Sequence, residues 1–221
     1  LYPFLVALGI AFAITPLVKR FAIRIGALTE PNSRSVHTTP TPHLGGIAMY
    51  VAFAASTVLF AQFPHRELYG ILAGGALSLL FGMIDDFRPL SPRTKLLGQV
   101  AIAVFAVFMG IRVDFLRNPM GGLFLLGRFG GLFTIMWIVS FMNVVNLIDG
   151  IDGLAAGVSS IAALTLLFVS LQQGQAFPAV LTAALAGSAL GFLKYNFNPA
   201  KIFMGDAGAH FLGFTLAAIS I

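Results

Sequence analysis

The run LFTIMWIVSFMNVVNLIDGIDGL, residues 132–154, decides the class of this protein. An apolar stretch from Leu132 to Met142 leads into a polar segment, and a second apolar stretch follows from Leu154 to Leu171. The polar side chains recur at every third position and are Asn143, Asn146, Asp149 and Asp152. At about 100° per residue, this spacing places them on one slowly drifting stripe of a helix. Carboxylates and carboxamides suit a hard cation with oxygen ligands, such as Mg²⁺.

The composition excludes an ordinary soluble globular domain. The chain is 58% apolar and only 10% charged, whereas soluble domains carry about 25% charged residues. It holds a succession of apolar runs of the length that crosses a bilayer, about 20 residues each. We therefore predict an all-α polytopic membrane protein. The absence of cysteine excludes disulfides, thiolate metal sites and Cys nucleophiles.

Eight apolar runs predict a bundle of about eight transmembrane helices. They cover residues 1–18, 45–63, 68–84, 95–113, 132–147, 154–172 and 177–195, with a last helix beginning near residue 210. Pro16 is expected to kink or thin the end of the first helix. The turn Asn118-Pro-Met-Gly-Gly122 lies between short apolar stretches and predicts a small β-hairpin on the outer face. We expect one domain over residues 1–221, truncated at both ends.

The basic residues predict the orientation of the helices. Nine of the 13 Lys and Arg residues follow the first, third, fifth or seventh helix, and four lie on the other side. The positive-inside rule makes the first side cytoplasmic, in a multi-pass protein of the plasma (inner) membrane. The net charge of +5 sits in short loops rather than in a basic tract, so it does not indicate nucleic acid.

Five of the eight acids fall on that same predicted face. They are Asp85, Asp86, Asp149, Asp152 and Asp206. Like charges gathered at low dielectric repel one another and require a cation, basic side chains or protons. A divalent metal is the most economical of these, and it would attract phosphate. Asp206 also lies between two glycines at a predicted helix start, which is a typical anion site.

Each of these features also has a purely structural interpretation. The Asp85-Asp86 pair could be a solvated helix end, and residues 203–208 could be a simple turn. Asn196 could serve only to end its helix. The loop at residues 32–46 contains Arg34 and His37; such a loop can hold phosphate, but a flexible connector explains it nearly as well.

Four motifs, in order along the chain, resemble a known superfamily. They are Pro40-Thr-Pro-His-Leu-Gly-Gly46, Gly82-Met-Ile-Asp-Asp-Phe87, the Asn143–Leu154 segment and Asn196–Gly208. Together they resemble the polyprenyl-phosphate N-acetylhexosamine-1-phosphate transferases. The motif variants look like the undecaprenyl-phosphate N-acetylglucosamine-1-phosphate transferases, which initiate teichoic acid, lipopolysaccharide O-antigen and related polysaccharides. The phospho-MurNAc-pentapeptide transferase of peptidoglycan synthesis is the nearest relative to exclude.

The resemblance implies a reaction and its partners. A UDP-sugar, UDP-GlcNAc, and undecaprenyl phosphate would give undecaprenyl-diphosphate-GlcNAc and UMP at the cytoplasmic surface of the bilayer. The cofactor would be Mg²⁺, with Mn²⁺ as the alternative, and a homodimer is one expected assembly. Direct attack by the lipid phosphate and a covalent intermediate on an Asp are both open. A His-rich loop of the family is expected beyond the residues given.

The resemblance also assigns roles to residues. The expected catalytic residues are Asp85, Asp86 and Asp149. The expected substrate-binding residues are Arg34, His37, Asn143, Asn146, Asp152 and Asn196. The expected metal ligands are Asp206 and Asn146.

Two other classes of function compete with this one. A secondary transporter or cation channel would use the carboxylates for ion coupling, and it predicts acids near the middle of the membrane. A membrane scaffold without catalysis would leave five clustered acids unexplained. Acids at helix ends on one face, next to Gly-rich loops, favour chemistry at the membrane surface.

Overall fold

A computed structural model describes residues 1–29, 40–61, 66–117 and 121–221, which form an α-helical bundle. Its helices are α1 (Tyr2–Arg24), α2 (Gly45–Phe60), α3 (Arg66–Phe87), α4 (Pro92–Phe108), α5 (Gly130–Ile148), α6 (Leu154–Gln172), α7 (Ala176–Asn196) and α8 (Gly205–Ile219). Strand β1 (Leu28–Thr29) pairs antiparallel with β2 (Thr41–Pro42), and β3 (Phe115–Arg117) with β4 (Leu123–Leu125). The predicted all-α class is confirmed.

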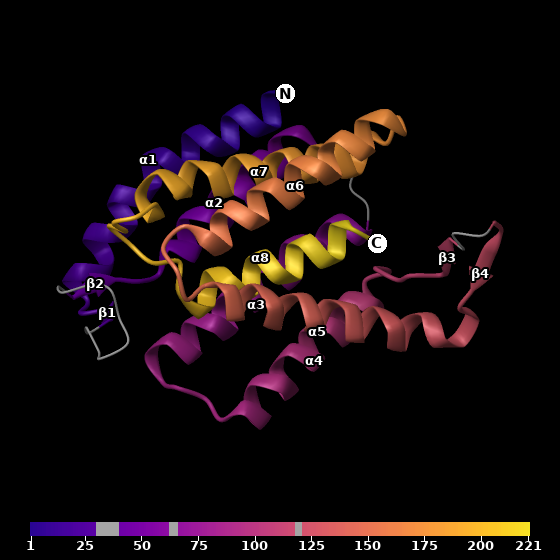
Figure 1. Cartoon of the computed structure of the whole chain (residues 1–221), viewed down its shortest axis with the longest axis horizontal. Coiled ribbons are helices and arrows are strands. Elements are labelled where there is room, and N and C mark those ends of the chain that lie inside the picture. The colour runs from indigo at the N-terminus through magenta and orange to yellow at the C-terminus, as the bar shows by residue number, and fades with distance from the viewer. Residues whose placement is uncertain (30–39, 62–65, 118–120) are drawn as a thin grey trace.

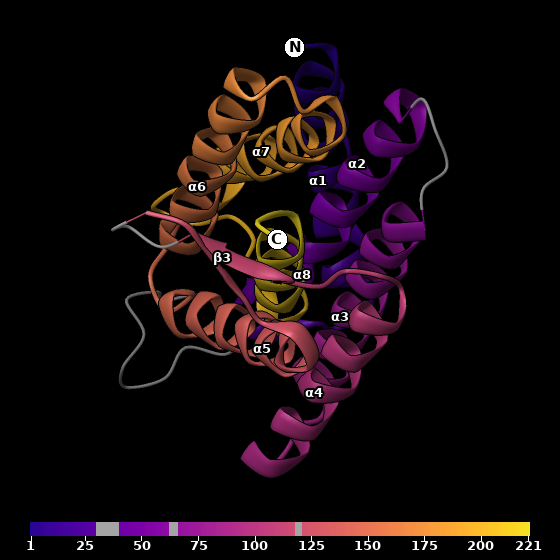
Figure 2. The same cartoon turned by 90° about the vertical axis from the view of Figure 1, so that its right-hand side faces the viewer.

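Helix α8 is the centre of the bundle. Viewed along the bundle, it lies inside a ring formed by the other helices (Figure 2). All of its residues from Ala207 to Ala218 are buried, and it packs against α2, α3 and α5. Small residues at many of its positions let the neighbouring backbones come close.

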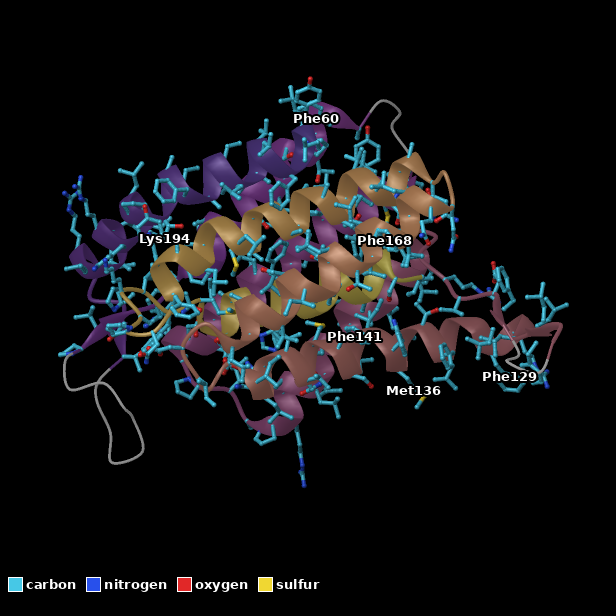
Figure 3. The ribbon with its side chains drawn as sticks, turned by 45° about the horizontal axis from the view of Figure 1, so that its top comes forward. Phe60, Phe129, Met136, Phe141, Phe168 and Lys194 are labelled. Carbon is cyan, nitrogen blue, oxygen red and sulfur yellow. The ribbon has the colours of Figure 1, made fainter. Side chains whose placement is uncertain are left out.

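The outside of the bundle is apolar. Large side chains such as Met136 and Phe168, each more than 60% exposed, project from its outer surface (Figure 3). Five helices of the described chain are long and apolar enough to cross a membrane: α1, α3, α5 with the preceding turn, α6 and α7. The shorter α2, α4 and α8 complete the bundle. These exposed apolar side chains are expected in a multi-pass membrane protein, whose outer surface contacts lipid.

Several predicted boundaries were wrong by a few residues, each for a local reason. Helix α1 continues through Pro16 to Arg24 because residues on both sides of the proline, Thr15 and Val18, are buried against the bundle. Helix α4 begins at Pro92 because the Ser91 hydroxyl caps it by accepting from the Thr94 N–H at 3.2 Å. Helix α8 begins at Gly205, a full turn before the predicted start. Helix α6 has the predicted bounds.

Two glycines bring α2 and α3 onto the start of α8. A Cβ at Gly46 or at Gly82 would overlap the backbone of α8 in its first turn. The N–H of Gly46 donates to the carbonyl of Met204 at 3.0 Å, so the start of α2 is tied to the segment that enters α8. Both glycine-containing motifs therefore allow the start of α2, the end of α3 and the start of α8 to pack closely together.

The predicted β-hairpin is confirmed as β3 and β4. It lies at one end of the bundle, whereas β1, β2 and the turn from α3 to α4 lie at the other end (Figure 1). The end of α3, the end of α5 and the start of α8 meet at this second end, to the left in Figure 1. We call it the acid end because Asp85, Asp149 and Asp206 all lie there.

Candidate active site

Asp206 is the residue on which the acid end converges. Its Oδ2 accepts from the Nζ of Lys95 at 3.0 Å, and its Oδ1 accepts from the Nδ2 of Asn146 at 2.7 Å. The same Lys95 Nζ lies 2.5 Å from Oδ2 of Asp85. The other oxygen of Asp85 accepts from the N–H of Leu90 at 2.8 Å. One ammonium group thus bridges two carboxylates from α3 and α8, and Asn146 adds α5 to the cluster.

Asp86 has different partners from its neighbour Asp85. Its two carboxylate oxygens accept from the backbone N–H groups of Asp206 and Ala207, at 2.8 and 3.1 Å. These are orphan donors of the first turn of α8, so Asp86 caps that helix from another helix. Gly205 has φ +72°, and a Cβ there would lie 2.6 Å from Oδ2 of Asp86. The Gly-Asp sequence therefore gives the Asp86 carboxylate access to the helix start.

Asp149 differs from these paired acids. It follows the last residue of α5 and is partly buried. Among the residues that the structure describes, no donor forms a hydrogen bond with its carboxylate. Burial raises the pKa of Asp149 well above its ordinary value. Nearby carboxylates raise this pKa further, in the order Asp206, Asp86 and Asp152. Asp149 is thus a carboxyl group without a counter-charge in the described part of the site.

The predicted single stripe of polar residues is only partly correct. Asn143 and Asn146 lie on α5, but the helix ends at Ile148 and a turn follows to Gly153, whose φ is +73°. This turn carries Asp152 away, where its Oδ2 accepts from the N–H of Ala200 at 2.8 Å. A helical period therefore cannot be extended across the two glycines.

Asn196 locks the same turn from the other side. Its Oδ1 accepts from the N–H of Gly153 at 3.2 Å, and its Nδ2 donates to the carbonyl of Ile202 at 3.1 Å. Asn196 is buried, and both ends of its amide are used within the chain. In this geometry Asp152 and Asn196 hold the α5–α6 turn against the segment before α8, and their predicted substrate contacts stay a prediction.

The Pro40–Gly46 motif brings one histidine to the acid end. His43 is buried; its Nδ1 lies 3.3 Å from Oγ1 of Thr29, and its ring lies edge-on to Phe87 at 6.1 Å. Burial lowers the pKa of His43, and the nearby Asp206 carboxylate partly opposes this. The predicted residues Arg34 and His37 lie outside the described residues.

Sequence reasoning missed the cation of the site. The sequence pattern indicates Lys95 only as a marker of membrane orientation, whereas in the structure it pairs with both Asp85 and Asp206. A usable signal existed, because Lys95 begins an otherwise uncharged helical stretch ten residues after Asp85. Among the described residues, Lys95 makes the ion pairs of Asp85 and Asp206, and Asp86 and Asp149 make none. Two of these four carboxylates therefore share one ammonium group, and the other two have no basic partner among the described residues.

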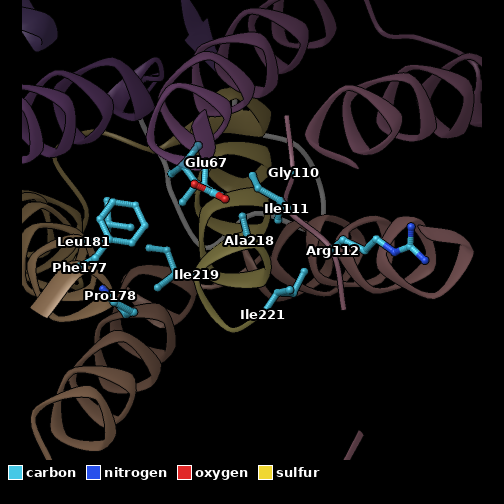
Figure 4. A pocket seen from close by; sticks show the side chains of 11 residues that line it. Glu67, Gly110, Ile111, Arg112, Phe177, Pro178, Leu181, Ala218, Ile219 and Ile221 are labelled. Atoms are coloured by element: carbon cyan, nitrogen blue, oxygen red, sulfur yellow. The ribbon is translucent and has the colours of Figure 1, made fainter. Parts of the chain in front are cut away.

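A cavity of about 240 Å³ lies at the other end of the bundle, between α3, α7 and the end of α8 (Figure 4). Its lining is mostly apolar, for example Phe177, Leu181 and Ile219, with Glu67 as its acid and Arg112 as its base. It lacks the convergence of acids from three helices that marks the acid end. We therefore place the candidate site at the acid end.

Residues 68–221 match the family model described as glycosyl transferase family 4. This chain belongs to glycosyl transferase family 4. It is 39% identical over 219 residues to the probable undecaprenyl-phosphate N-acetylglucosaminyl 1-phosphate transferase of Bacillus subtilis (strain 168), covering 99% of this chain and 61% of that protein. The predicted superfamily is confirmed.

Two further relatives mark the breadth of the family. The chain is 38% identical over 235 residues to the decaprenyl-phosphate N-acetylglucosaminephosphotransferase of Mycolicibacterium smegmatis, covering 98% of this chain and 58% of that protein. It is 35% identical over 255 residues to the phospho-N-acetylmuramoyl-pentapeptide-transferase of Desulforudis audaxviator, covering 99% and 76%. The chain thus spans less than two thirds of the length of the first two of these three relatives.

Proposed function

We propose that the protein containing this chain transfers GlcNAc-1-phosphate from UDP-GlcNAc to undecaprenyl phosphate, releasing UMP, and so initiates a cell-envelope polymer. The observation that carries this proposal is the cluster of polar side chains at one end of a membrane bundle. In it, Lys95 pairs with Asp85 and Asp206, and Asn146 donates to Asp206. The family adds support, because the two relatives with 39% and 38% identity are named as polyprenyl-phosphate GlcNAc transferases. The pentapeptide transferase relative is less similar, at 35%.

The proposed acceptor needs little activation by a base. The second proton of a phosphate monoester has a pKa of about 6, so undecaprenyl phosphate is largely dianionic at neutral pH. One of its oxygens would bond to the sugar-bearing phosphorus as the diphosphate linkage breaks and UMP leaves. The main barrier is the approach of two anions, which positioned cations and dipoles lower. Lys95, held by two carboxylates, is the cation that the described chain supplies.

The chemistry of the donors at the acid end supports Mg²⁺, although no three His, Asp or Glu side chains of the described residues are grouped closely enough to hold an ion by themselves. Asp206 and Asn146 offer carboxylate and carboxamide oxygens, and Asp149 adds a carboxyl group that lacks a counter-charge among the described residues. Oxygen ligands of this kind suit a hard divalent cation. In the proposal Asp206 and Asn146 hold the ion. When bound, it would neutralise the charge on the diphosphate of the donor.

The remaining residues receive roles consistent with their contacts. Asp85 would orient Lys95 toward the reacting phosphates, and Asp86 would fix the start of α8 and with it Asp206. Asp149, whose carboxyl group accepts no hydrogen bond from the described residues, would act on a substrate. Arg34 and His37 remain proposed phosphate contacts. The prenyl chain would pack against the apolar outer surface of the bundle, with the acid end at the cytoplasmic face.

A cation-coupled transporter is the alternative from another class. It would place ionisable groups near the middle of the membrane. In the described residues, the acids lie at the ends of helices or beyond them, as Asp85, Asp149 and Asp206 illustrate. This placement favours the transferase.

The direct test uses the full-length protein in detergent with undecaprenyl phosphate and either UDP-GlcNAc or UDP-MurNAc-pentapeptide. We expect UMP to be released from UDP-GlcNAc and not when the acceptor lipid is omitted. Release only from the pentapeptide donor would move the protein to the peptidoglycan branch. Release from neither donor, in folded protein, would contradict the proposed reaction.

A further inference from the structure

A chain of three polar side chains lies directly behind the acid end: Gln99 and His210 are buried, and Asn143 is exposed. The Nε2 of Gln99 lies 3.0 Å from the Nε2 of His210, and the Nδ2 of Asn143 donates to the Oε1 of Gln99 at 2.6 Å. Gln99 and His210 have exposed fractions of 2% and 0%. We call these three residues the α4–α5–α8 bridge, because each comes from a different helix.

The hydrogen bonds of the bridge have one self-consistent direction. The Nδ1 of His210 lies 2.8 Å from the backbone carbonyl of Asp206, which can only accept, so Nδ1 carries the ring proton. In the neutral ring, Nε2 must then accept from the amide of Gln99. Asn143 also donates to the carbonyl of Val139 at 2.8 Å. Since a buried polar group without a partner costs free energy, the bond between Gln99 and His210 fixes α4 relative to α8. The exposed Asn143 joins α5 to this pair through its bond to Gln99.

The bridge repeats the geometry of the site one helical turn away. The same three helices meet first at Lys95, Asp206 and Asn146, and again at the bridge. On each helix the bridge residue stands three or four positions from the site residue. These pairs are Lys95 with Gln99, Asn146 with Asn143, and Asp206 with His210. Residues at such spacing share a helix face, so a shift at the bridge moves the site side chain with it.

Helix α4 depends on the bridge more than its neighbours do. Besides Gln99, its buried residues are Ile102, Ala103 and Ala106, all beyond the bridge. The turn that carries Lys95 therefore lacks a buried apolar anchor of its own. On the α3 side, Phe81 lies edge-on to His210 at 5.9 Å. Apart from the ion pairs of Lys95 itself, the bridge is thus the nearest buried hydrogen bond that ties α4 to α8.

We propose that Gln99 and His210 are positioning residues that hold Lys95 and Asn146 on the two oxygens of Asp206. Neither residue is proposed to touch a substrate. Their effect on turnover rests on the proposed function, whereas their effect on the placement of α4 does not.

A matched pair of variants at residue 210 isolates the bond between α4 and α8. In His210→Asn, the amide can still donate to the Asp206 carbonyl, but the side chain is too short to reach Gln99. In His210→Gln, the longer side chain offers an oxygen to the amide of Gln99. We expect His210→Asn to lower kcat by about 10²-fold, because small misplacements cost that much. We expect KM for both substrates to stay within about twofold, and His210→Gln to retain most of the rate.

Ser56→Ala controls for the general loss of a buried hydrogen bond. The Ser56 hydroxyl donates to the carbonyl of Pro3 at 2.7 Å, joining α2 to α1 away from the bridge. This variant should lower the melting temperature about as much as His210→Asn does, with kcat unchanged. An equal fall in kcat for Ser56→Ala and His210→Asn would overturn the proposal.

A distance measurement separates the proposal from the reaction. Spin labels can be placed at Leu97→Cys on α4 and Ile161→Cys on α6, both well exposed, because these 221 residues contain no cysteine and any cysteine elsewhere in the full-length protein can be replaced by serine. In the full-length protein, His210→Asn should shift or broaden the distance distribution between the labels, and His210→Gln should not. This result in protein that releases no UMP would leave the positioning intact and refute only the reaction. An unchanged distribution in His210→Asn, or the same change in both variants, would overturn the proposal.

Discussion

The two ends of this bundle hold the same kinds of residue in opposite ways. At the hairpin end, Arg112 Nε lies 3.1 Å from Oδ1 of Asp114, two positions along the chain, and the Asp114 side chain is 71% exposed. At the acid end, Lys95 pairs with Asp85, whose side chain is 1% exposed, and with Asp206 from a distant helix. An exposed local pair contributes little free energy. A buried pair that joins separate helices makes the fold and the site depend on each other.

The largest expected effect comes from removing the shared ammonium group. Lys95→Met leaves the Asp85 carboxylate buried without its partner, and breaking such a pair costs about 3–5 kcal/mol. We expect this loss in the free energy of unfolding, measured by denaturation in detergent, together with loss of UMP release. An unchanged free energy of unfolding in Lys95→Met would show that the ion pair at the acid end contributes as little as the exposed pair at the hairpin end.

Asp206→Asn is expected to affect chemistry more than folding. The amide keeps the size of the side chain but removes the charge that faces Lys95 and the proposed metal. We expect UMP release to fall by about 10³-fold, which is typical for loss of a group that stabilises charge in the transition state. The protein should still be recovered folded from the membrane. Wild-type turnover would refute the metal assignment.

Asp86→Ala tests the cap on α8. Loss of a helix cap costs about 1–2 kcal/mol, and here it also frees the helix that presents Asp206. We expect a lower melting temperature and loss of UMP release together, with Asp86→Asn intermediate in stability because it retains one acceptor. A melting temperature equal to that of the wild type would argue that the cap is not formed.

Asp149→Asn is expected to separate stability from activity. Because burial raises the pKa of Asp149 above its unfolded value of about 3.9, the folded state binds its proton more tightly. Ionisation as the pH rises then lowers the free energy of unfolding. Without Mg²⁺ at pH 7, the variant should melt at or above the wild type, and the difference should shrink near pH 4. A variant less stable than the wild type at pH 7 would contradict this.

Asp114→Asn, at the hairpin end, should have the smallest effect. Exposed ion pairs contribute about 0.2–1 kcal/mol, so its melting temperature should barely move and UMP release should be unchanged. It is the matched control for Asp206→Asn.

The gathering of acids could be predicted from sequence because it depends only on which helices they follow. Their individual partners could not. Asp85 and Asp86 are adjacent, yet about 100° of helix rotation directs one to Lys95 and the other to the start of α8. The turn before Gly153 broke the predicted stripe, since a helical period says nothing about where a helix ends. The site role of Lys95 was hidden because the same charge also marks membrane orientation.

Gln99 and His210 show the same limit. A polar residue inside an apolar run indicates a buried partner, but the sequence does not name it. His210 lies 111 positions from Gln99, and only the packing of α8 in the centre of the bundle brings them together. Long-range pairs of this kind depend on tertiary structure rather than on local pattern.

The central claim is the proposal that the acids of the described part of the site, which have Lys95 as their basic partner, also bind a divalent cation. The most direct measurement is the melting temperature of the full-length protein with and without Mg²⁺, for the wild type, Asp206→Asn and Asp114→Asn. A ligand that binds only the folded state stabilises it, by about 2.7 kcal/mol at 100 times its Kd. We predict that Mg²⁺ raises the melting temperature of the wild type and Asp114→Asn but not that of Asp206→Asn. No rise in the wild type, or an equal rise in Asp206→Asn, would contradict the claim.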